Sequence, residues 1–292
     1  MKAARAKALR LRADATVEQG FAQIAASCLT QVAGNQAGLV GGAEPEFVHQ
    51  MRVGLRRLRS ALSLFKPWIT LPDALAKEMT WLGQALGAAR DAEVLATSTL
   101  PKLLRAGADK QELLDLQPAA AAEAQRRRRE AAAAVDSARY RRLILRLTRW
   151  LKSKGWRAAS ICPEGLSEPL AFASTRLLRR RLKKVKALTL VLQTQASAEN
   201  RHALRIAVKK LRYASEFLSA FASAKARARL ARLSALQELL GQLNDAEVAQ
   251  RRLQALAQAQ PALLEAAAFA RGVLWTQTQQ QIKALDPLLL TF

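Results

Sequence analysis

Apolar residues recur every three or four positions along almost the whole chain, and no stretch shows the alternation of apolar and polar residues typical of a β-strand. Ala, Leu, Arg and Gln, which all favour helices, dominate the composition. Glycine and proline interrupt the pattern at 34–45, 66–73, 152–156, 162–169 and 258–261. The pattern therefore predicts an all-α protein whose helices are separated by these segments.

Two phrases of the sequence occur twice at nearly the same offset. HQMRVGLRRLR at 49–59 is matched by HALRIAVKKLR at 202–212, and LGQALGAARDAEV at 82–94 is matched by LQELLGQLNDAEV at 236–248. Repetition of this kind indicates an internal duplication. We therefore predict one domain over 14–285 that is built from two helical bundles of about four helices each, over 14–155 and 168–285, related by a pseudo-twofold axis. Residues 1–13 form a basic tail.

The first repeated phrase predicts a helix with one basic and one apolar side. On a helical wheel the cations fall within an arc of about 80° beside the histidine. The basic rows are His49, Arg52, Arg56 and Arg59 in the first copy, and His202, Arg205, Lys209 and Arg212 in the second. The apolar sides are Met51, Leu55, Leu58, Leu62 and Phe65, and Leu204, Val208, Leu211 and Leu218.

Acidic residues are excluded from both rows. None occurs between 47 and 72 or between 200 and 215. Like charges three, four and seven residues apart repel one another, so a solvated face would normally include Glu. Arginine offers a planar fork to phosphate and lysine a mobile point charge. The rows therefore favour an anion-binding surface over a merely solvated one.

The charge of the whole chain supports this interpretation. Lys and Arg number 47 against 23 acidic residues, which gives a formal net charge of +24 and an isoelectric point near 11.3. An excess of this size destabilises the compact state through self-repulsion. A polyanionic partner would offset it, and nucleic acid, an anionic membrane and an inorganic phosphate polymer all qualify.

Two further basic helices are predicted. The segment at 176–186 presents Arg176, Arg179, Arg180 and Lys183 opposite its leucines, and the segment at 138–154 presents an auxiliary row of Arg139, Arg142, Arg146 and Arg149. The alternative for each helix is a charged face that only aids solubility.

The duplicated His/Arg phrase and the two DAEV phrases resemble those of the CHAD domain family, named for a conserved histidine in an α-helical domain. The resemblance covers about residues 14 to 285 and implies two helical bundles around a basic central groove that binds inorganic polyphosphate. Carried over by motif, the groove residues are His49, Arg52, Arg56, Arg57 and Arg59, and His202, Arg205, Lys209, Lys210 and Arg212. The basic helix at 176–186 fits the first helix of the second half. The copies differ at Arg90, which is replaced by Asn244, and in their outer helices, so we expect an asymmetric surface.

The sequence favours a binding protein over an enzyme. It contains no Walker phosphate loop, HExxH or GxSxG motif. His49 and His202 each stand among cations, which would repel a divalent metal ion, so we expect neither a metal nor a cofactor. Asp91 and Asp245 are expected to cap the helices that they open, or to orient a groove arginine. The same arginines should lower the pKa of each histidine in the empty site.

Nucleic acid is the main rival ligand because charge alone would bind it weakly and without sequence preference. Single-strand binders also use aromatic stacking platforms. Aromatic residues make up only 5% of this chain, although Trp150 and Trp156 lie beside basic residues. A third alternative, a coat on a membrane or granule surface, requires exposed apolar residues on a helix.

The expected location is the cytoplasm, with association with polyphosphate granules as an extension. Cys28 and Cys162 form no CxxC or disulfide framework, which fits a reducing compartment. No apolar run approaches the ~18 residues of a transmembrane helix. The N-terminal segment is basic without a secretory apolar region, and an organellar presequence stays open as an alternative.

Overall fold

The computed structural model describes residues 1–42, 44–105, 110–160, 162–222 and 224–289. Within these ranges the regular structure is helical and contains no β-strand. The prediction of an all-α protein is therefore confirmed.

The first half of the chain contains α1 (Val17–Ala33), α2 (Gln36–Val40), α3 (Glu46–Leu64), α4 (Asp73–Val94), the π-helical turn η1 (Leu95–Thr99), α5 (Leu100–Arg105), α6 (Lys110–Asp136) and α7 (Ala138–Lys152). The short 3-10 turns η2 (Arg157–Ala159) and η3 (Glu164–Ser167) lead into the second half. That half contains α8 (Leu170–Thr194), α9 (Ala198–Phe217), η4 (Ser219–Phe221), α10 (Ala224–Ala259), η5 (Pro261–Leu263) and α11 (Leu264–Leu289).

The predicted interruptions fall between helices with one exception. Residues 34–45 were expected to be irregular, yet they contain the short helix α2. Its first turn follows Asn35, whose side chain is fully buried and donates to the carbonyls of Ala4 and Gln31 at 2.9 and 2.7 Å. The N-terminal segment therefore holds this turn in place, and such a contact between distant segments leaves no local signal.

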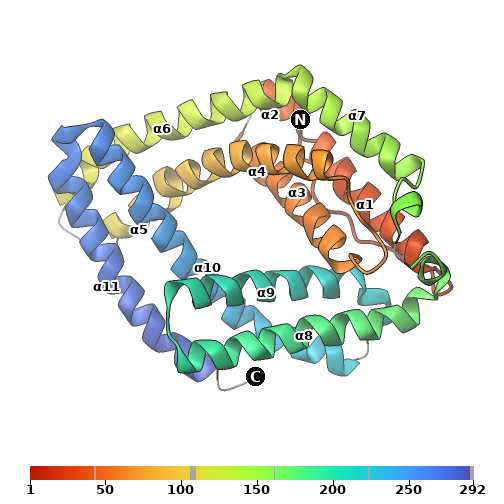
Figure 1. Ribbon diagram of the computed structural model, residues 1–292. Coiled ribbons are helices and arrows are strands. Elements are labelled where there is room, and N and C mark those ends of the chain that lie inside the picture. Colours follow the sequence, from red (N-terminus) through yellow and green to blue (C-terminus); the bar gives the residue numbers. More distant parts are fainter. Residues whose placement is uncertain (43, 106–109, 161, 223, 290–292) are drawn as a thin grey trace.

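The same order of neighbours occurs in both halves. α1 packs on α3, α3 on α4 and α4 on α6, while α8 packs on α9, α9 on α10 and α10 on α11. α7 packs on α1, α4 and α6, and the described part of the second half contains no helix in the matching place. In Figure 1 the helices lie around a four-sided frame, with α4 and α9 on its inner side.

The two halves begin side by side. Thr16 caps α1 because its hydroxyl oxygen accepts a hydrogen bond from the backbone N–H of Gln19, and the side-chain oxygen of Gln19 accepts one from the backbone N–H of Thr16. Next to this cap, Val17 N donates to Glu168 O at 2.9 Å and Leu170 N donates to Ala15 O at 2.8 Å. These backbone bonds hold the starts of α1 and α8 together.

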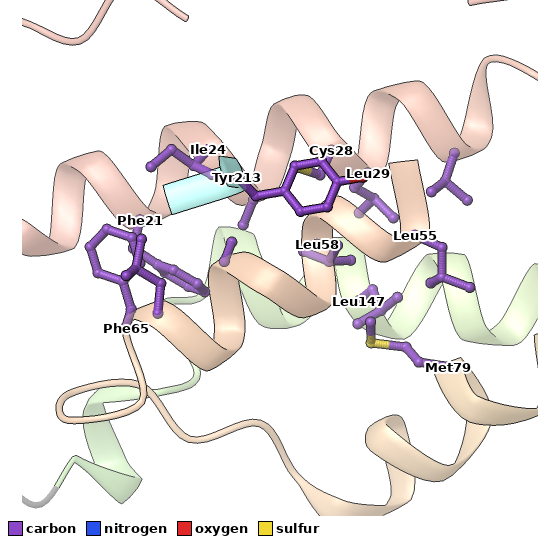
Figure 2. Packing of buried hydrophobic residues seen from close by; sticks show 14 of the residues in the cluster. Phe21, Ile24, Cys28, Leu29, Leu55, Leu58, Phe65, Met79, Leu147 and Tyr213 are labelled. Atoms are coloured by element: carbon purple, nitrogen blue, oxygen red, sulfur yellow. The ribbon is translucent and has the colours of Figure 1, made fainter. Parts of the chain in front are cut away.

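The C-terminal part of α9 enters the core of the first half. Tyr213, Phe217 and Leu218 are almost fully buried and pack in one cluster with side chains of α1 and α3. Figure 2 shows Tyr213 among residues of these two helices, including Cys28, Leu29 and Leu58. This packing fixes how α3 and α9 face each other.

A second apolar cluster joins the halves at the far ends of α4 and α10. It combines Leu95 and Leu100 of the first half with Leu253 and Leu274 of the second. Beside it, Arg252 of α10 donates to Ala88 O of α4 at 3.0 Å. The two halves are therefore joined in two places, one between α9 and the α1–α3 core and one between the ends of α4 and α10.

Arg57 lies at the contact between α3 and the C-terminal part of α9 and does not line a groove. Only 3% of this residue is exposed, and its guanidinium pairs with Glu216 of α9 and lies 5.0 Å from the centre of the Phe217 ring. The expectation that Arg57 lines a groove with Arg56 is thus wrong. Consecutive residues of a helix point about 100° apart, so Arg57 turns into the core while Arg56 does not.

We predict that Glu216→Ala lowers the free energy of unfolding by about 1–3 kcal/mol, because it leaves the buried Arg57 without its charged partner. Urea unfolding followed by circular dichroism measures the change.

The matched control for this variant is Glu238→Ala on α10. Glu238 is exposed and forms no ion pair within the described structure, so its loss should change stability by no more than about 0.5 kcal/mol. Equal losses in the two variants would contradict a structural role for the Arg57–Glu216 pair.

Candidate functional site

The basic row of α3 lies on the side of the helix that is not used for packing. Arg52 and Arg56 are half-buried, whereas Met51, Leu55 and Leu58 on the other side are at most 3% exposed. The sequence-based division of this helix into a basic and an apolar side is confirmed. The same division holds in α9, where Leu204, Val208 and Leu211 are buried.

The rows of α3 and α9 face each other. Burial is the main cause that lowers the pKa of Arg205, and Arg56 and Arg52 of the opposite helix lower it further. Lys209 likewise interacts electrostatically with Arg52 and Arg56. Arg90 of α4 also interacts electrostatically with Arg52. We call these five residues the central basic cluster: Arg52, Arg56, Arg90, Arg205 and Lys209.

Two carboxylates partly balance this cluster. Asp91 lies 3.6 Å from Arg52, and both Asp91 and Asp245 act electrostatically on Arg52 and Arg205. Both aspartates lie inside long helices, α4 and α10, and neither opens a helix. The expected capping role is therefore wrong, and the alternative of orienting a groove arginine fits the Arg52–Asp91 contact. A glycine inside a helix costs only about 1 kcal/mol relative to alanine, so α4 and α10 continue through Gly87 and Gly241.

Unsatisfied groups remain within the cluster. Arg205 Nε is buried and has no hydrogen-bond partner in the described structure. The pKa of Lys209 is lowered to about 7, first by burial and then by Arg205 and Arg56, with Asp245 opposing the change. A buried polar group without a partner and a lysine held near its neutral form both cost free energy. An added anion would relieve both.

Arg56 is positioned by the other half of the protein. Its Nε donates to the hydroxyl of Tyr213 on α9 at 2.7 Å, and its guanidinium carbon lies 5.6 Å from the centre of the Tyr213 ring. Since Tyr213 is only 1% exposed, the arginine is held by a rigid core residue.

The two histidines occupy different surroundings. His49 is half-buried, and its pKa is lowered by burial first and by Arg90 next, with Glu46 opposing. The expected lowering by arginines is thus confirmed for His49, although burial contributes more. His202 is exposed and lines a pocket of about 240 Å³ together with Arg201, Arg205 and Trp275.

Several predicted groove residues lie outside the cluster. Lys210 interacts with Arg181 of α8 and not with the central residues. Arg59 donates to Met79 O of α4 at 2.8 Å and acts electrostatically on Arg52. Arg212 stacks on Tyr213, with its guanidinium carbon 4.4 Å from the ring centre. These residues lie outside the cluster, and Arg59 and Arg212 contact Met79 and Tyr213 instead.

The auxiliary row of α7 is separate. Arg139, Arg142, Arg146 and Arg149 are all exposed. Arg139 pairs with Glu78 of α4 at 2.6 Å and lies 4.2 Å from the centre of the Trp81 ring. Glu78 and Gly87 are nine residues apart and therefore point about 180° apart on α4. Because Gly87 faces Arg52, the α7 row lies on the other side of α4 from the cluster.

The basic helix α8 is also outside the cluster. Arg176 pairs with Glu168 at 2.7 Å, and Arg179, Arg180 and Lys183 are exposed. Sequence analysis missed Arg181, which is half-buried and donates to Ser63 Oγ at 3.0 Å. The available signal was its position four residues from both Leu177 and Val185, in the apolar stripe of α8.

Arg90 was also missed as a site residue. It directly precedes Asp91 in the repeated phrase and lies three residues after Gly87. That spacing places it on the same side of α4 as the glycine that faces Arg52, which was the signal available in the sequence.

The tryptophans considered as stacking platforms are not available. Trp156 is fully buried and Trp150 is 8% exposed. Both pack edge-on against Phe21, with ring centres 5.1 and 6.1 Å from it. The idea that they stack on nucleic-acid bases is therefore wrong.

The family model of the CHAD domain matches residues 23–254 of this sequence. The chain belongs to the CHAD domain family. This confirms the resemblance carried by the duplicated His/Arg and DAEV phrases.

Solved structures agree with this assignment. The CHAD domain from the plant Ricinus communis is 39% identical, with a TM-score of 0.86 over 99% of this chain and 96% of that one. PptA from Streptomyces chartreusis is 16% identical, with a TM-score of 0.65 over 95% of this chain and 99% of that one. The second likeness shows the fold alone. No match was found among the curated proteins.

Two other kinds of site are absent from the described residues of the CHAD chain. Within the described ranges, no helix is long and apolar enough to cross a bilayer. The part of the chain that the structure describes also contains no cluster of three or more His, Cys, Asp or Glu side chains suited to a metal ion.

We predict that Lys209 titrates near pH 7, measured by the NMR shift of its side-chain Cε signal. Because this pKa lies below the value near 10.5 expected in the unfolded chain, the folded state binds fewer protons between these values. The contribution of Lys209 to stability should therefore rise as the pH increases from about 7 towards 10.5.

The Lys209→Met variant identifies the signal by its loss. Because Lys209→Met removes this unfavourable charge, the variant should be more stable than the parent near pH 7. This advantage in unfolding free energy should shrink as the pH rises through the window. A Cε signal that titrates only near pH 10.5 would contradict the position of Lys209 inside a crowded cationic cluster.

Proposed function

We propose that this CHAD protein binds inorganic polyphosphate at the central basic cluster and does not catalyse a reaction on it. The observation that carries the proposal is the approach of Arg52 and Arg56 on α3 to Arg205 and Lys209 on α9, with Arg205 Nε left without a partner. Folding brings like charges together here, and an anion that contacts both helices would turn this repulsion into attraction.

A phosphate polymer suits the arrangement because it offers closely spaced negative charges along a flexible chain. Arg52, Arg56 and Arg59 follow one another along α3 at intervals of about one turn, roughly 4.5–6 Å. Several phosphates bound at once give multivalent affinity that a single phosphate cannot reach. The function implied by the CHAD resemblance agrees with this chemistry.

Nucleic acid fits less well. Trp150, Trp156 and Tyr213 are buried, so they cannot stack on bases. Trp275, which is 59% exposed, lines the pocket beside His202 and offers a single stacking platform in this region. Binding along a strand normally uses several such platforms. Competition with DNA and RNA is therefore part of the test.

The absence of catalysis is proposed from the surroundings of the carboxylates. Asp91 is engaged by Arg52, and Asp245 interacts with Arg205 and Lys209. Asp91 and Asp245 therefore orient the arginines, and the protein's role is to hold the polymer, with attachment to polyphosphate granules as one setting for it.

We predict that the double variant Arg52→Gln, Lys209→Gln binds long-chain polyphosphate at least about tenfold more weakly at low salt, since each charge-assisted hydrogen bond contributes about 1.5–3 kcal/mol. Calorimetric titration over a range of salt concentrations measures the affinity. The slope of log affinity against log salt should also fall, because fewer counterions are displaced.

The matched control is Arg142→Gln, Arg149→Gln on α7, which removes the same charge from the exposed outer row. It should retain most of the affinity. An equal loss in both double variants would mean that only net charge matters and would reject the central site. Stronger binding of duplex DNA, RNA or anionic vesicles than of polyphosphate at equal ionic strength would favour the rival ligands.

A glycine substitution tests the geometry without changing charge. A Cβ at Gly87 would lie 2.6 Å from a guanidinium nitrogen of Arg52, so Gly87→Ala must move that arginine. Alanine is a better helix former by about 1 kcal/mol. We therefore predict that Gly87→Ala weakens polyphosphate binding severalfold while the melting temperature is maintained or raised.

Gly241→Ala is the control in the second half. Gly241 occupies the matching place in the repeated phrase, and a Cβ there would meet nothing within 4 Å. This variant should gain stability and keep its affinity for polyphosphate. Unchanged binding by Gly87→Ala would show that the position of Arg52 does not limit binding.

A further inference from the structure

A second basic pocket lies away from the central cluster, where α3 ends against α8. Its volume is about 410 Å³. The lining residues are Ser63, Leu64, Lys66, Pro67, Leu177, Arg180 and Arg181. Small-molecule sites in proteins span roughly 300–1,000 Å³, so this pocket is suited to a compact ligand.

Arg181 is a half-buried cation in the lining of this pocket. In the sequence of α8 it stands four residues from both Leu177 and Val185. Its guanidinium is half-buried and donates to Ser63 Oγ at 3.0 Å. Burial lowers the pKa of Arg181, and the neighbouring Arg180 lowers it further. Among the described residues, no carboxylate opposes this lowering of the pKa of Arg181. The Ser63 hydroxyl accepts from the arginine, which leaves its hydrogen available to an oxygen of a ligand.

Lys210 of α9 brings a cation from a third helix close to Arg181. Its pKa is lowered by burial first and by Arg181 next. Lys66, just after the end of α3, is exposed and lines the mouth. Within the described part of the chain, none of the four cations forms an ion pair. Elsewhere on α8 the protein does pair its arginines, as with Arg176 and Glu168.

The pocket is separate from the central cluster. Ser63 lies seven residues, or about 10 Å, beyond Arg56 along the same side of α3. Lys209 and Lys210 are adjacent but point about 100° apart, one towards the cluster and the other towards Arg181. A ligand can therefore occupy either site alone.

We propose that the pocket lined by Ser63, Lys66, Arg180 and Arg181, with Lys210 close enough to interact electrostatically with Arg181, binds a single compact phosphate group. Two guanidinium groups, one ammonium group and a hydroxyl line the pocket from α8 and from the end of α3, and such a set of donors matches the several oxygens and multiple charge of phosphate. The apolar walls formed by Leu64, Pro67 and Leu177 limit the size of the ligand.

The phosphate group has two sources. Free phosphate or pyrophosphate would occupy the pocket directly, whereas the end of a polyphosphate chain would reach it along α3 from the central cluster. The second source rests on the proposed function, and the first is independent of it. The test is therefore made with pyrophosphate before any polymer is added.

The full-length protein is titrated with pyrophosphate near 0.15 M salt, where long-range attraction is screened, and the Arg181 Nε–Hε signal is followed by NMR. We expect this signal to shift and saturate. Arg181→Met should weaken pyrophosphate binding about tenfold or more. Arg180→Gln, an exposed position, should weaken it in the same direction and serves as the second variant should Arg181→Met disturb folding.

Lys186→Gln is the matched control, since Lys186 is an exposed cation of α8 that does not line the pocket. It should bind pyrophosphate like the parent. Loss of affinity in Lys186→Gln equal to that in Arg180→Gln, or an Arg181 signal that does not move, would overturn the pocket. The Arg181 signal reports on this pocket, whereas the central site is tested by the polyphosphate affinity of Arg52→Gln, Lys209→Gln, so failure of the central site is distinguishable.

Long-chain polyphosphate is added last. Displacement of pyrophosphate from the pocket supports the pocket with a chain end as its occupant. Retention of pyrophosphate while the polymer binds elsewhere supports the pocket as a site for free phosphate.

Discussion

The packing of α9 into the core of the first half determines how the charged surfaces of this protein meet. Tyr213 and Phe217 enter an apolar cluster with α1 and α3, and Glu216 neutralises the buried Arg57 at the same crossing. Residues of α9 on the side next to this contact then face Arg52 and Arg56. The hydrophobic free energy of the crossing therefore holds together cations that would repel one another on independent helices.

Repulsion within the cluster has consequences for each of its members. Arg56 is held by the Tyr213 hydroxyl and Arg52 lies beside Asp91, whereas Arg205 keeps an unpaired Nε and Lys209 has a pKa of about 7. Arg52 and Arg56 are thus held by direct side-chain contacts, whereas Arg205 and Lys209 are influenced by Asp245 electrostatically. A bound anion would gain most from the second half, where it supplies the missing partner and favours protonation of the lysine.

The internal duplication supplies two similar helices, and the protein uses them differently. Arg57 is a buried structural residue, whereas the matching Lys210 interacts electrostatically with Arg181. α7 covers the first half, and the described part of the second half lacks such a layer. The basic surface is consequently asymmetric, with a central cluster, a separate pocket at the end of α3 and an outer row on α7.

The sequence alone determined the helical class, the duplication and the basic and apolar sides of α3 and α9, because these features repeat with the period of a helix and depend on local spacing. It also indicated the CHAD family through phrases that stay contiguous. Tertiary structure decided which cations meet. Arg57 and Arg56 are equivalent in a count of charge, and only the crossing of α3 with α9 buries one and presents the other. Arg90, Arg181 and the non-capping places of Asp91 and Asp245 likewise depend on contacts between helices far apart in the chain, for which the spacing of residues along one helix carries no information.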